Sequence, residues 1–323
     1  MNSFGTLFRV SLFGESHGEV LGVLIDGCPH GIPLQPTDFI DDIERRMSGR
    51  RGTTLRKEAD IPLIKSGVFN GKTTGAPILI EFQNSNVHSK DYSSIKTVPR
   101  PGHADFVADK KFGGDNDYRG GGHFSGRLTL PLVAAGVIAK KMVKTASFSA
   151  RIVEIGGKKE WNSALNQAIE QKDSLGGIIE MTISNLPISL GEPFFDSIES
   201  LISHAVFAVP GVKGIEFGAG FSSAKMKGSE MNDAIISPDG TTETNNAGGI
   251  NGGISNGNDI VFRTAIKPPS SIGKTQQSVD LTTGRLTEFT LEGRHDTAFV
   301  LRVPVIIEAI SAIVCADLTL RKV

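Results

Sequence analysis

The chain has 323 residues, of which 39% are hydrophobic and 21% charged, and this composition excludes a chain that is mainly disordered. Its 34 Lys and Arg against 35 Asp and Glu leave a formal net charge of −1 at pH 7. A chain without excess positive charge lacks the field that attracts nucleic acids or acidic membrane surfaces, so we expect neither as a partner.

The apolar pattern predicts, in chain order, strands at 7–13 and 20–25, a helix at 38–47, strands at 61–68 and 76–82, helices at 132–144 and 160–172, a strand at 177–184, a helix at 195–208, strands at 212–217 and 260–266, and a helix at 305–320. The predicted strands are short runs bordered by Gly, Pro and Asn, and three helices begin near Thr37, Pro131 and Pro304. Strands outnumber helices and do not alternate with them, which disfavours a doubly wound parallel sheet. We therefore predict an α+β fold and one domain over residues 1–323.

Glycine departs most from ordinary composition: 38 of 323 residues, about 12%, against a usual value of about 7%. The glycines gather in short polar motifs, a pattern typical of backbone that approaches a ligand closely. Two stretches of this kind, 113–122 and 228–254, lack strong signals for helix or strand. Long structureless stretches in compact domains commonly serve a function, so we expect both to be functional loops.

The two cysteines, Cys28 and Cys315, are far apart in the chain and have apolar neighbours. They indicate buried reduced thiols and no disulfide framework or zinc site. The apolar run 309–316 is far shorter than the ~20 residues that a membrane span needs, and no signal-peptide pattern stands at the start. These features predict a cytoplasmic protein.

Three patterns suggest functions that the sequence does not favour. Residues 14–18 match the G-x-S-x-G elbow of serine hydrolases, but that elbow needs a helix after the serine, and 20–25 is predicted as a strand. Residues 67–73 resemble a phosphate-binding P-loop but are one residue short. The dinucleotide fingerprint G-x-G-x-x-G does not occur. A Ser-His hydrolase stays open as a minor alternative.

Four of the seven histidines lie in compact motifs with Gly, Arg and Asp: His17, His103, His123 and His295. An imidazole titrates near pH 6.5, which suits proton transfer near neutral pH. A lone histidine is more often structural, but several in glycine-framed polar loops favour catalysis. Since the histidines lack the i, i+4 spacing of a zinc helix, we expect no metal site.

Six cations lie within thirteen residues: Arg45, Arg46, Arg50, Arg51, Arg56 and Lys57. Guanidinium groups bind phosphate and carboxylate in a bidentate manner. In a chain without net positive charge, this local cluster predicts a small anionic ligand. A solvated surface whose arginines stabilise the end of a helix is the alternative.

Residues 245–257 hold five glycines and five amide or hydroxyl side chains, which cannot form a packed core. Such a loop can present backbone N–H groups to a flat heterocycle or a phosphate. Residues 267–271 follow a predicted strand and offer one cation and two hydroxyls. We interpret both segments as ligand-binding, with a plain glycine-rich surface loop as the alternative for the first.

Six motifs resemble the chorismate synthase family, in the order of that family and nearly from end to end of the chain: 13–18, 100–105, 117–122, 247–257, 267–271 and 294–296. Residues 123–127 read His-Phe-Ser-Gly-Arg where many members carry Arg-Ser-Ser-Ala-Arg. The resemblance implies a helical core between antiparallel β-sheets and a homotetramer.

The resemblance also implies a carbon–oxygen lyase of the shikimate pathway. Its reaction is the 1,4-anti elimination of phosphate from 5-enolpyruvylshikimate 3-phosphate, which gives chorismate. The implied cofactor is reduced FMN, with NADPH as a candidate reductant. A non-catalytic relative that binds phosphate or a nucleotide is the alternative, and the altered segment around His123 is the feature that suggests it.

Within this resemblance, His17 is expected to protonate the departing phosphate, and His103 to protonate or stabilise the reduced flavin near N1. Asp296, helped by Ser16, is expected to take the N5 proton so that N5 can accept the C6 proton of the substrate. The residues expected to hold the anionic substrate are Arg45, Arg46, Arg51 and Arg127. Those expected to contact the cofactor are His123, Phe124, Ser125, Pro210, Gly211, Gly252, Lys267, Pro268, Pro269, Ser270, Ser271 and Arg294.

Overall fold

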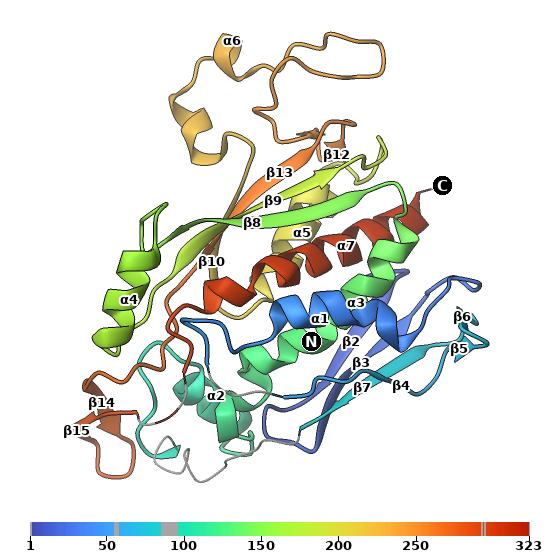
Figure 1. The fold of residues 1–323 in the computed structure, drawn as a ribbon. Coiled ribbons are helices and arrows are strands. Elements are labelled where there is room, and N and C mark those ends of the chain that lie inside the picture. The colour runs from blue at the N-terminus through green and yellow to red at the C-terminus, as the bar shows by residue number, and fades with distance from the viewer. Residues whose placement is uncertain (1, 55–57, 85–95, 292, 294, 323) are drawn as a thin grey trace.

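The computed structural model describes residues 2–54, 58–84, 96–291, 293 and 295–322. Figure 1 shows two antiparallel sheets with the longest helices between them. This is the helical core between antiparallel sheets that the resemblance implies, and the α+β assignment made from the sequence pattern is confirmed.

The first sheet carries the N-terminus. Its strands are ordered β1 (Ser3–Phe4), β2 (Arg9–Gly14), β3 (Val20–Asp26), β7 (Ile78–Gln83) and β4 (Leu63–Ile64). Strand β7 alternates, with Ile78, Ile80 and Phe82 buried. Since alternate side chains of a strand point to opposite faces, this pattern turns one face of the sheet toward the helices.

The second sheet has the order β10 (Val212–Phe217), β13 (Ile260–Ile266), β9 (Gly177–Ser184) and β8 (Ser147–Ile155). Strands β13 and β9 pair over their full lengths, from Ile260 opposite Ile183 to Ile266 opposite Gly177. The buried residues of β9 again alternate along the strand. Both sheets therefore contribute one apolar face to the interior.

Four helices fill the space between the sheets: α1 (Ile40–Arg46), α3 (Thr129–Met142), α5 (Ile198–Phe207) and α7 (Pro304–Arg321). The sequence suggested one apolar stripe on the last helix, but every residue from Val305 to Leu318 is buried. A helix that lies between two layers is covered on all sides, and its buried carboxylates have partners: Glu308 binds Arg45, and Asp317 accepts from the backbone N–H groups of residues 6–8.

Shorter elements lie around this core. They are the 3-10 turns η1 (Pro36–Phe39), η3 (Arg119–Phe124), η4 (Gly126–Leu128), η5 (Phe194–Asp196), η6 (Gly220–Lys225) and η7 (Phe299–Arg302), the helices α2 (Asp105–Phe112), α4 (Asn162–Glu170) and α6 (Gly228–Met231), and the hairpins β5–β6 (Val68–Phe69 and Lys72–Thr73), β11–β12 (Ile250–Asn251 and Ile254–Ser255) and β14–β15 (Gln276–Asp280 and Arg285–Phe289). Helix α6 lies on an arm that extends beyond the second sheet (Figure 1). Within the described residues, no helix combines the length and apolar character needed to cross a bilayer.

The predicted strands 177–184, 212–217 and 260–266 have the bounds seen in the structure. The single strand expected at 61–68 is wrong: the chain there forms β4, a turn and the start of the β5–β6 hairpin. Strand β8, helix α2 and hairpin β14–β15 were not predicted. Hairpin β14–β15 is largely polar, and α2 exposes Phe106, Val107 and Phe112, so neither has an apolar face toward the core. Strand β8 does alternate, with Phe148, Ala150 and Ile152 half-buried, and this signal was overlooked.

Helices α3 and α7 approach so closely at Gly136 that no side chain fits there. A Cβ added to Gly136 would lie 2.3 Å from the Cβ of Ala309. We expect Gly136→Ala to lower the free energy of unfolding, because overpacking costs about 1–3 kcal/mol while the gain in helix propensity is only about 1 kcal/mol. Urea unfolding measures the change.

Gly228→Ala is the matched control, because a Cβ at Gly228 meets no atom of the described residues within 4 Å. The control should unfold like the unmodified chain. A Gly136→Ala variant as stable as this control would contradict the packing described here.

Candidate active site

A cavity of about 710 Å³ opens at one end of the helical layer. Its walls come from Asn2–Phe4 and β2, the end of α1, the η3–α3 segment, the end of α5, residues 208–213, residues 267–271 and the stretch from His295 to Arg302. Cavities of about 300–1,000 Å³ commonly hold small ligands in proteins. Segments from the whole length of the chain therefore meet around a space of ligand size.

A turn of three glycines lies between two of the predicted histidines. Gly120, Gly121 and Gly122 all have positive φ, which suits glycine and strains other residues. A Cβ at Gly120 would lie 2.6 Å from the His17 ring, and a Cβ at Gly121 would lie 3.2 Å from the His103 ring. The bare backbone of this turn thus allows two imidazoles from distant segments to approach it.

Ser16 and His17 follow β2 in a turn that leads directly into β3. This strand–turn–strand arrangement differs from the strand–turn–helix of a hydrolase elbow. Ser16 lines the cavity. His17 is 6% exposed and lies behind Gly120, which itself lines the cavity. The structure therefore places His17 one residue away from the cavity wall.

His103 is held at the cavity by Arg100 and Asp105. Its Nδ1 lies 2.6 Å from Asp105 Oδ1, and Arg100 donates to both carboxylate oxygens at 2.7 Å. Burial raises the pKa of Asp105, but hydrogen bonds from Arg100 and then His103 outweigh it, so the pKa lies well below its usual value. An anionic Asp105 accepts the Nδ1 hydrogen, which fixes the ring orientation.

We expect Asp105→Asn to lower the free energy of unfolding at pH 7 by on the order of 3 kcal/mol, because it leaves Arg100 without its anionic partner. A carboxyl whose pKa is lowered by folding stabilises the folded state above its unfolded pKa of about 3.9, and this contribution declines as pH falls further. The stability difference between the two proteins should therefore be constant above about pH 5 and shrink below about pH 4.

Urea unfolding at several pH values tests this, with Asp109→Asn on the same helix as control. Asp109 pairs with Lys110 at 3.6 Å near the surface, so its loss should cost little. A stability difference for Asp105→Asn that does not change between pH 7 and pH 3 would contradict the role of the ionised carboxyl.

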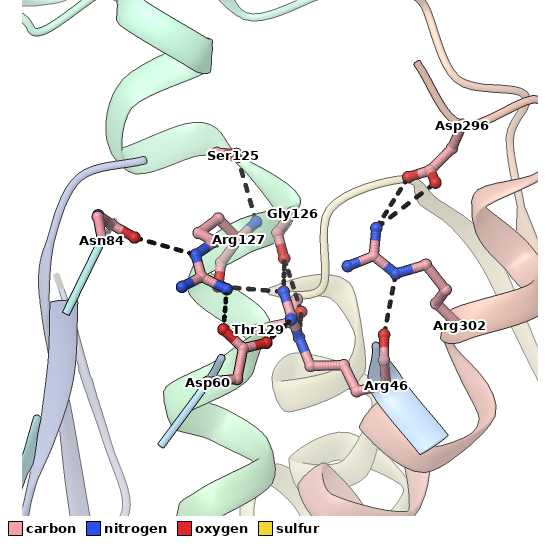
Figure 2. A network of polar contacts seen from close by, with 9 residues as sticks. All are labelled: Arg46, Asp60, Asn84, Ser125, Gly126, Arg127, Thr129, Asp296 and Arg302. Carbon is pink, nitrogen blue, oxygen red and sulfur yellow. Dashed lines mark hydrogen bonds and ion pairs between the residues drawn. The ribbon is translucent and has the colours of Figure 1, made fainter. Parts of the chain in front are cut away.

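Asp60 joins two arginines that come from different segments of the chain (Figure 2). Arg127 Nη1 donates to Asp60 Oδ1 at 2.5 Å, and Arg46 Nη1 lies 3.4 Å from Asp60 Oδ2. Arg46 also donates to the hydroxyl of Thr129 and to the backbone oxygens of residues 126 and 127. Burial, followed by the charge of Arg302, lowers the pKa of Arg46 well below its usual value.

Two of the three side-chain nitrogens of Arg127 donate to protein acceptors. Its Nε donates to Asn84 Oδ1 at 3.1 Å and its Nη1 to Asp60, whereas Nη2 is buried and has no hydrogen-bond partner among the described residues. A buried donor without a partner is costly, and protein structures rarely contain one. Arg127 lines the cavity, and a ligand anion that reaches Nη2 would supply its missing partner.

Asp296 lies at another part of the cavity wall and is held by two donors. The N–H of Thr54 donates to Oδ1 at 2.8 Å, and Arg302 Nη1 donates to Oδ2 at 3.1 Å. Arg302 in turn donates from Nε to the backbone oxygen of Arg46 (Figure 2). The carboxylate thus has a fixed direction and belongs to the same polar network as the arginines.

The segment 267–271 brings a cation to the cavity. Lys267 Nζ donates to Gly102 O at 3.0 Å and to Ser270 Oγ at 2.5 Å, and the Ser271 hydroxyl accepts from Arg100 at 2.9 Å. Burial, followed by the nearby charge of Lys213, lowers the pKa of Lys267. Both lysines line the cavity, so an anionic group bound there would stabilise their charged forms.

Most of the predicted site residues line this one cavity: Ser16, Arg46, His103, His123, Phe124, Ser125, Arg127, Pro210, Gly211, Lys267, Pro268, Pro269, Ser270, Ser271 and Asp296. His123 also fixes the wall, since its Nδ1 lies 2.8 Å from Gly14 O and its Nε2 3.2 Å from Asn2 Oδ1. Arg294, Arg56 and Lys57 lie outside the described residues.

Three predicted residues, Arg45, Arg51 and Gly252, do not line this cavity. Arg45 binds Glu308 of α7 through both terminal nitrogens, at 2.6 and 2.7 Å, because neighbouring helical residues point about 100° apart and Arg46 takes the inward direction. Arg51 is exposed and absent from the cavity wall. Gly252 lies at the tip of the β11–β12 hairpin, likewise off the wall.

Several residues that build the site were not singled out from the sequence: Thr54, Asp60, Asn84, Arg100, Asp105 and Arg302. Arg100 and Asp105 stand in the quoted motif 100–105, which was the available signal. Asp60 has a φ of 48°, unusual for a residue other than glycine, but no sequence pattern marks it.

Comparison with known proteins places this geometry in a family. A family model described as chorismate synthase matches residues 8–320. The curated chorismate synthase of Chitinophaga pinensis is 59% identical over 323 residues, covering all of this chain and 97% of that protein. That of Methanocaldococcus jannaschii is 40% identical and covers 99% of this chain and 97% of the other.

A solved structure gives the same result. A crystal structure of chorismate synthase matches with a TM-score of 0.76 at 27% identity, covering 99% of this chain and 93% of that one. A whole-length family match, whole-length identities of 40% and 59%, and a shared fold agree with one another. The chain therefore belongs to the chorismate synthase family.

Proposed function

We propose that this chain performs the reaction of its family in the 710 Å³ cavity. The reaction eliminates phosphate from 5-enolpyruvylshikimate 3-phosphate to give chorismate and is that of a carbon–oxygen lyase. The observation that carries the proposal is the buried Arg127 Nη2, a cationic donor without a partner among the described residues, on a residue that lines the cavity together with an imidazole and a carboxylate.

The charges of the cavity suit this substrate. It carries two carboxylates and a phosphate, and the wall offers the cations of Arg127, Lys213 and Lys267. Arg46 is 1% exposed, and each of its side-chain nitrogens donates to a protein acceptor, so we assign it mainly the role of a fixed positive charge in the cavity wall. A charge that needs no reorganisation is effective when the leaving group gains charge.

The residues present also fit reduced FMN. The cavity has the volume of a cofactor site, the wall includes the phenyl ring of Phe124, and the two crowded lysines favour a bound phosphate. Residues 123–125, Pro210, Gly211 and 267–271 would hold the cofactor. When bound, reduced FMN supplies electron density transiently to the allylic system of the substrate, which no side chain can do. NADPH is proposed only as its reductant.

The side chains supply and accept protons around that chemistry. His103, fixed by Asp105, is assigned to hold a proton at the cavity wall near the cofactor. Asp296, which Thr54 and Arg302 hold in place, is assigned as the base, and Ser16 is assigned to help it. His17, behind Gly120, is assigned as the acid for the departing phosphate. Such groups contribute about 10²–10⁴-fold each.

The alternative of a non-catalytic phosphate- or nucleotide-binding relative is not favoured, because the compared relatives of 40–59% identity over the whole chain are chorismate synthases. We further propose a cytoplasmic homotetramer, as the family resemblance implies. Light scattering of the purified protein tests the assembly.

An anaerobic assay tests the proposed function. Purified protein is mixed with 5-enolpyruvylshikimate 3-phosphate and FMN that is either chemically reduced or oxidised, and chorismate and free phosphate are measured. Equal amounts of both products with reduced FMN, and none with oxidised FMN, are expected. Binding of substrate and FMN without either product would support the non-catalytic alternative instead.

A further inference from the structure

Asp60 is an anion placed inside a site for anions, and the reaction chemistry gives it no task. Its side chain is 3% exposed, and it contacts Arg46 and Arg127 through different oxygens (Figure 2). Its backbone has a φ of 48°, a conformation that residues other than glycine seldom adopt. Strained backbone at a cavity is maintained where the surrounding structure requires it.

The contacts of Arg127 show what Asp60 can do. A guanidinium group is planar and its donors have fixed directions. With Nε bound to Asn84 and Nη1 bound to Asp60, the plane of Arg127 is set by two partners, and the direction of Nη2 follows. This is the buried nitrogen that has no partner among the described residues. Asp60 therefore determines where the unpaired donor points.

Asp60 also separates two like charges. Arg46 and Arg127 both reach this carboxylate, and Arg46 Nη2 lies 3.3 Å from the backbone oxygen of Arg127. Without an anion between them, two buried guanidinium groups repel each other, and the more mobile one would turn away. Arg46 is held by Thr129 and two backbone oxygens besides, so Arg127 is the one that would move.

We propose that Asp60 is a positioning residue, which aims the Arg127 Nη2 donor at the anionic group of the substrate by bridging Arg127 and Arg46. The identity of that substrate rests on the proposed function. The role of Asp60 is indirect: it touches the arginines and leaves the reacting atoms to other groups.

The direction in which KM changes when Asp60 is neutralised distinguishes a positioning role from a simple electrostatic one. Asp60 is negative, so by charge alone its neutralisation should strengthen the binding of a trianion and lower KM. If Asp60 acts by aiming Arg127, neutralisation should weaken binding and raise KM. The loss of one charge-assisted hydrogen bond of about 1.5–3 kcal/mol corresponds to a rise of about 10–100-fold.

The experiment compares Asp60→Asn, Arg127→Ala and the double variant, with KM and kcat for 5-enolpyruvylshikimate 3-phosphate in the presence of reduced FMN. Each single variant should raise KM. The double variant should match Arg127→Ala, because Asp60 has nothing left to position. A KM for folded Asp60→Asn that is unchanged or lower, or a double variant whose effects simply add, would overturn the proposal.

Glu308→Gln is the matched control for the loss of a buried carboxylate. Glu308 is 2% exposed and binds Arg45 and Lys140 away from the cavity wall. It should lower thermal stability and leave KM unchanged, and a KM rise equal to that of Asp60→Asn would overturn the specific role. If Asp60→Asn does not fold, Asp60→Glu replaces it: the shifted carboxylate should raise KM, and a wild-type KM would count against the proposal.

Failure of the proposed function would be visible separately. An unmodified chain that forms no chorismate contradicts the function but leaves binding measurable by calorimetric titration with the same substrate. Weaker binding by Asp60→Asn than by the unmodified chain would then still support positioning. Equal or tighter binding would refute it.

Discussion

Replacement of Asp296 by Asn is expected to lower kcat by about 10²–10⁴-fold while substrate and FMN still bind. Asn has the shape of Asp and keeps one oxygen that can accept from the N–H of Thr54, but its NH2 group replaces the oxygen that accepts from Arg302. The variant loses the capacity to accept a proton together with this one contact. Loss of one such contact alone should cost far less turnover than loss of the base, and steady-state turnover with reduced FMN measures the effect.

Asp173→Asn serves as the control, because Asp173 pairs with Lys274 and does not line the cavity. Its kcat should equal that of the unmodified chain. Full activity of Asp296→Asn would remove Asp296 from proton transfer and leave it as an anchor for Thr54 and Arg302.

Replacement of His17 by Ala is expected to have a similar effect, about 10²–10⁴-fold on kcat, with flavin binding largely kept. The structure sharpens this prediction, since His17 lies behind Gly120 and is 6% exposed. A proton from His17 can serve the departing phosphate only past the bare Gly120 backbone or through the neighbouring Ser16, which lines the cavity. Rapid quenching that follows phosphate release measures the affected step.

His30→Ala, at an exposed histidine outside the cavity, is the control and should be fully active. Added imidazole should restore part of the activity of His17→Ala if the lost group is a proton donor. Unchanged phosphate release in His17→Ala would assign the acid to another residue.

The fold could be predicted where a strand or helix has an apolar face of its own. Strands β9, β10 and β13 are continuous or alternating apolar runs, and their bounds were predicted from that pattern. Strand β8 alternates exposed Ser147, Ser149 and Arg151 with half-buried Phe148, Ala150 and Ile152, so it could have been predicted as a strand, whereas its pairing with β9 is not visible in any local pattern. Helix α7 was found, but its complete burial follows only from the two layers around it.

The chemical groups of the site could be predicted from the sequence better than their positions. The glycine-framed motifs of His103 and of residues 267–271 do meet at one cavity. Arg45 and Arg46 look alike in sequence, yet one binds Glu308 and the other faces Asp60, because helical residues one position apart point in different directions. That difference depends on how α1 is rotated against its neighbours, which the arginine-rich pattern does not contain.

The residues that the sequence analysis missed are those that orient other side chains of the site. Asp60, Asp105 and Arg302 each hold a side chain that the motifs did suggest: Arg127, His103 and Asp296. Their partners lie 67, 2 and 6 positions away in the chain. Supporting contacts of this kind arise from the fold, so a sequence motif can reveal the acting side chain without revealing the residue that orients it.

The most direct test of the account is a crystal structure of the protein with oxidised FMN and 5-enolpyruvylshikimate 3-phosphate bound. We predict both ligands in the cavity lined by His103, Arg127 and Asp296, with a phosphate or carboxylate oxygen of the substrate within hydrogen-bond distance of Arg127 Nη2. A substrate bound elsewhere, with Arg127 Nη2 still buried and without a partner, would contradict it.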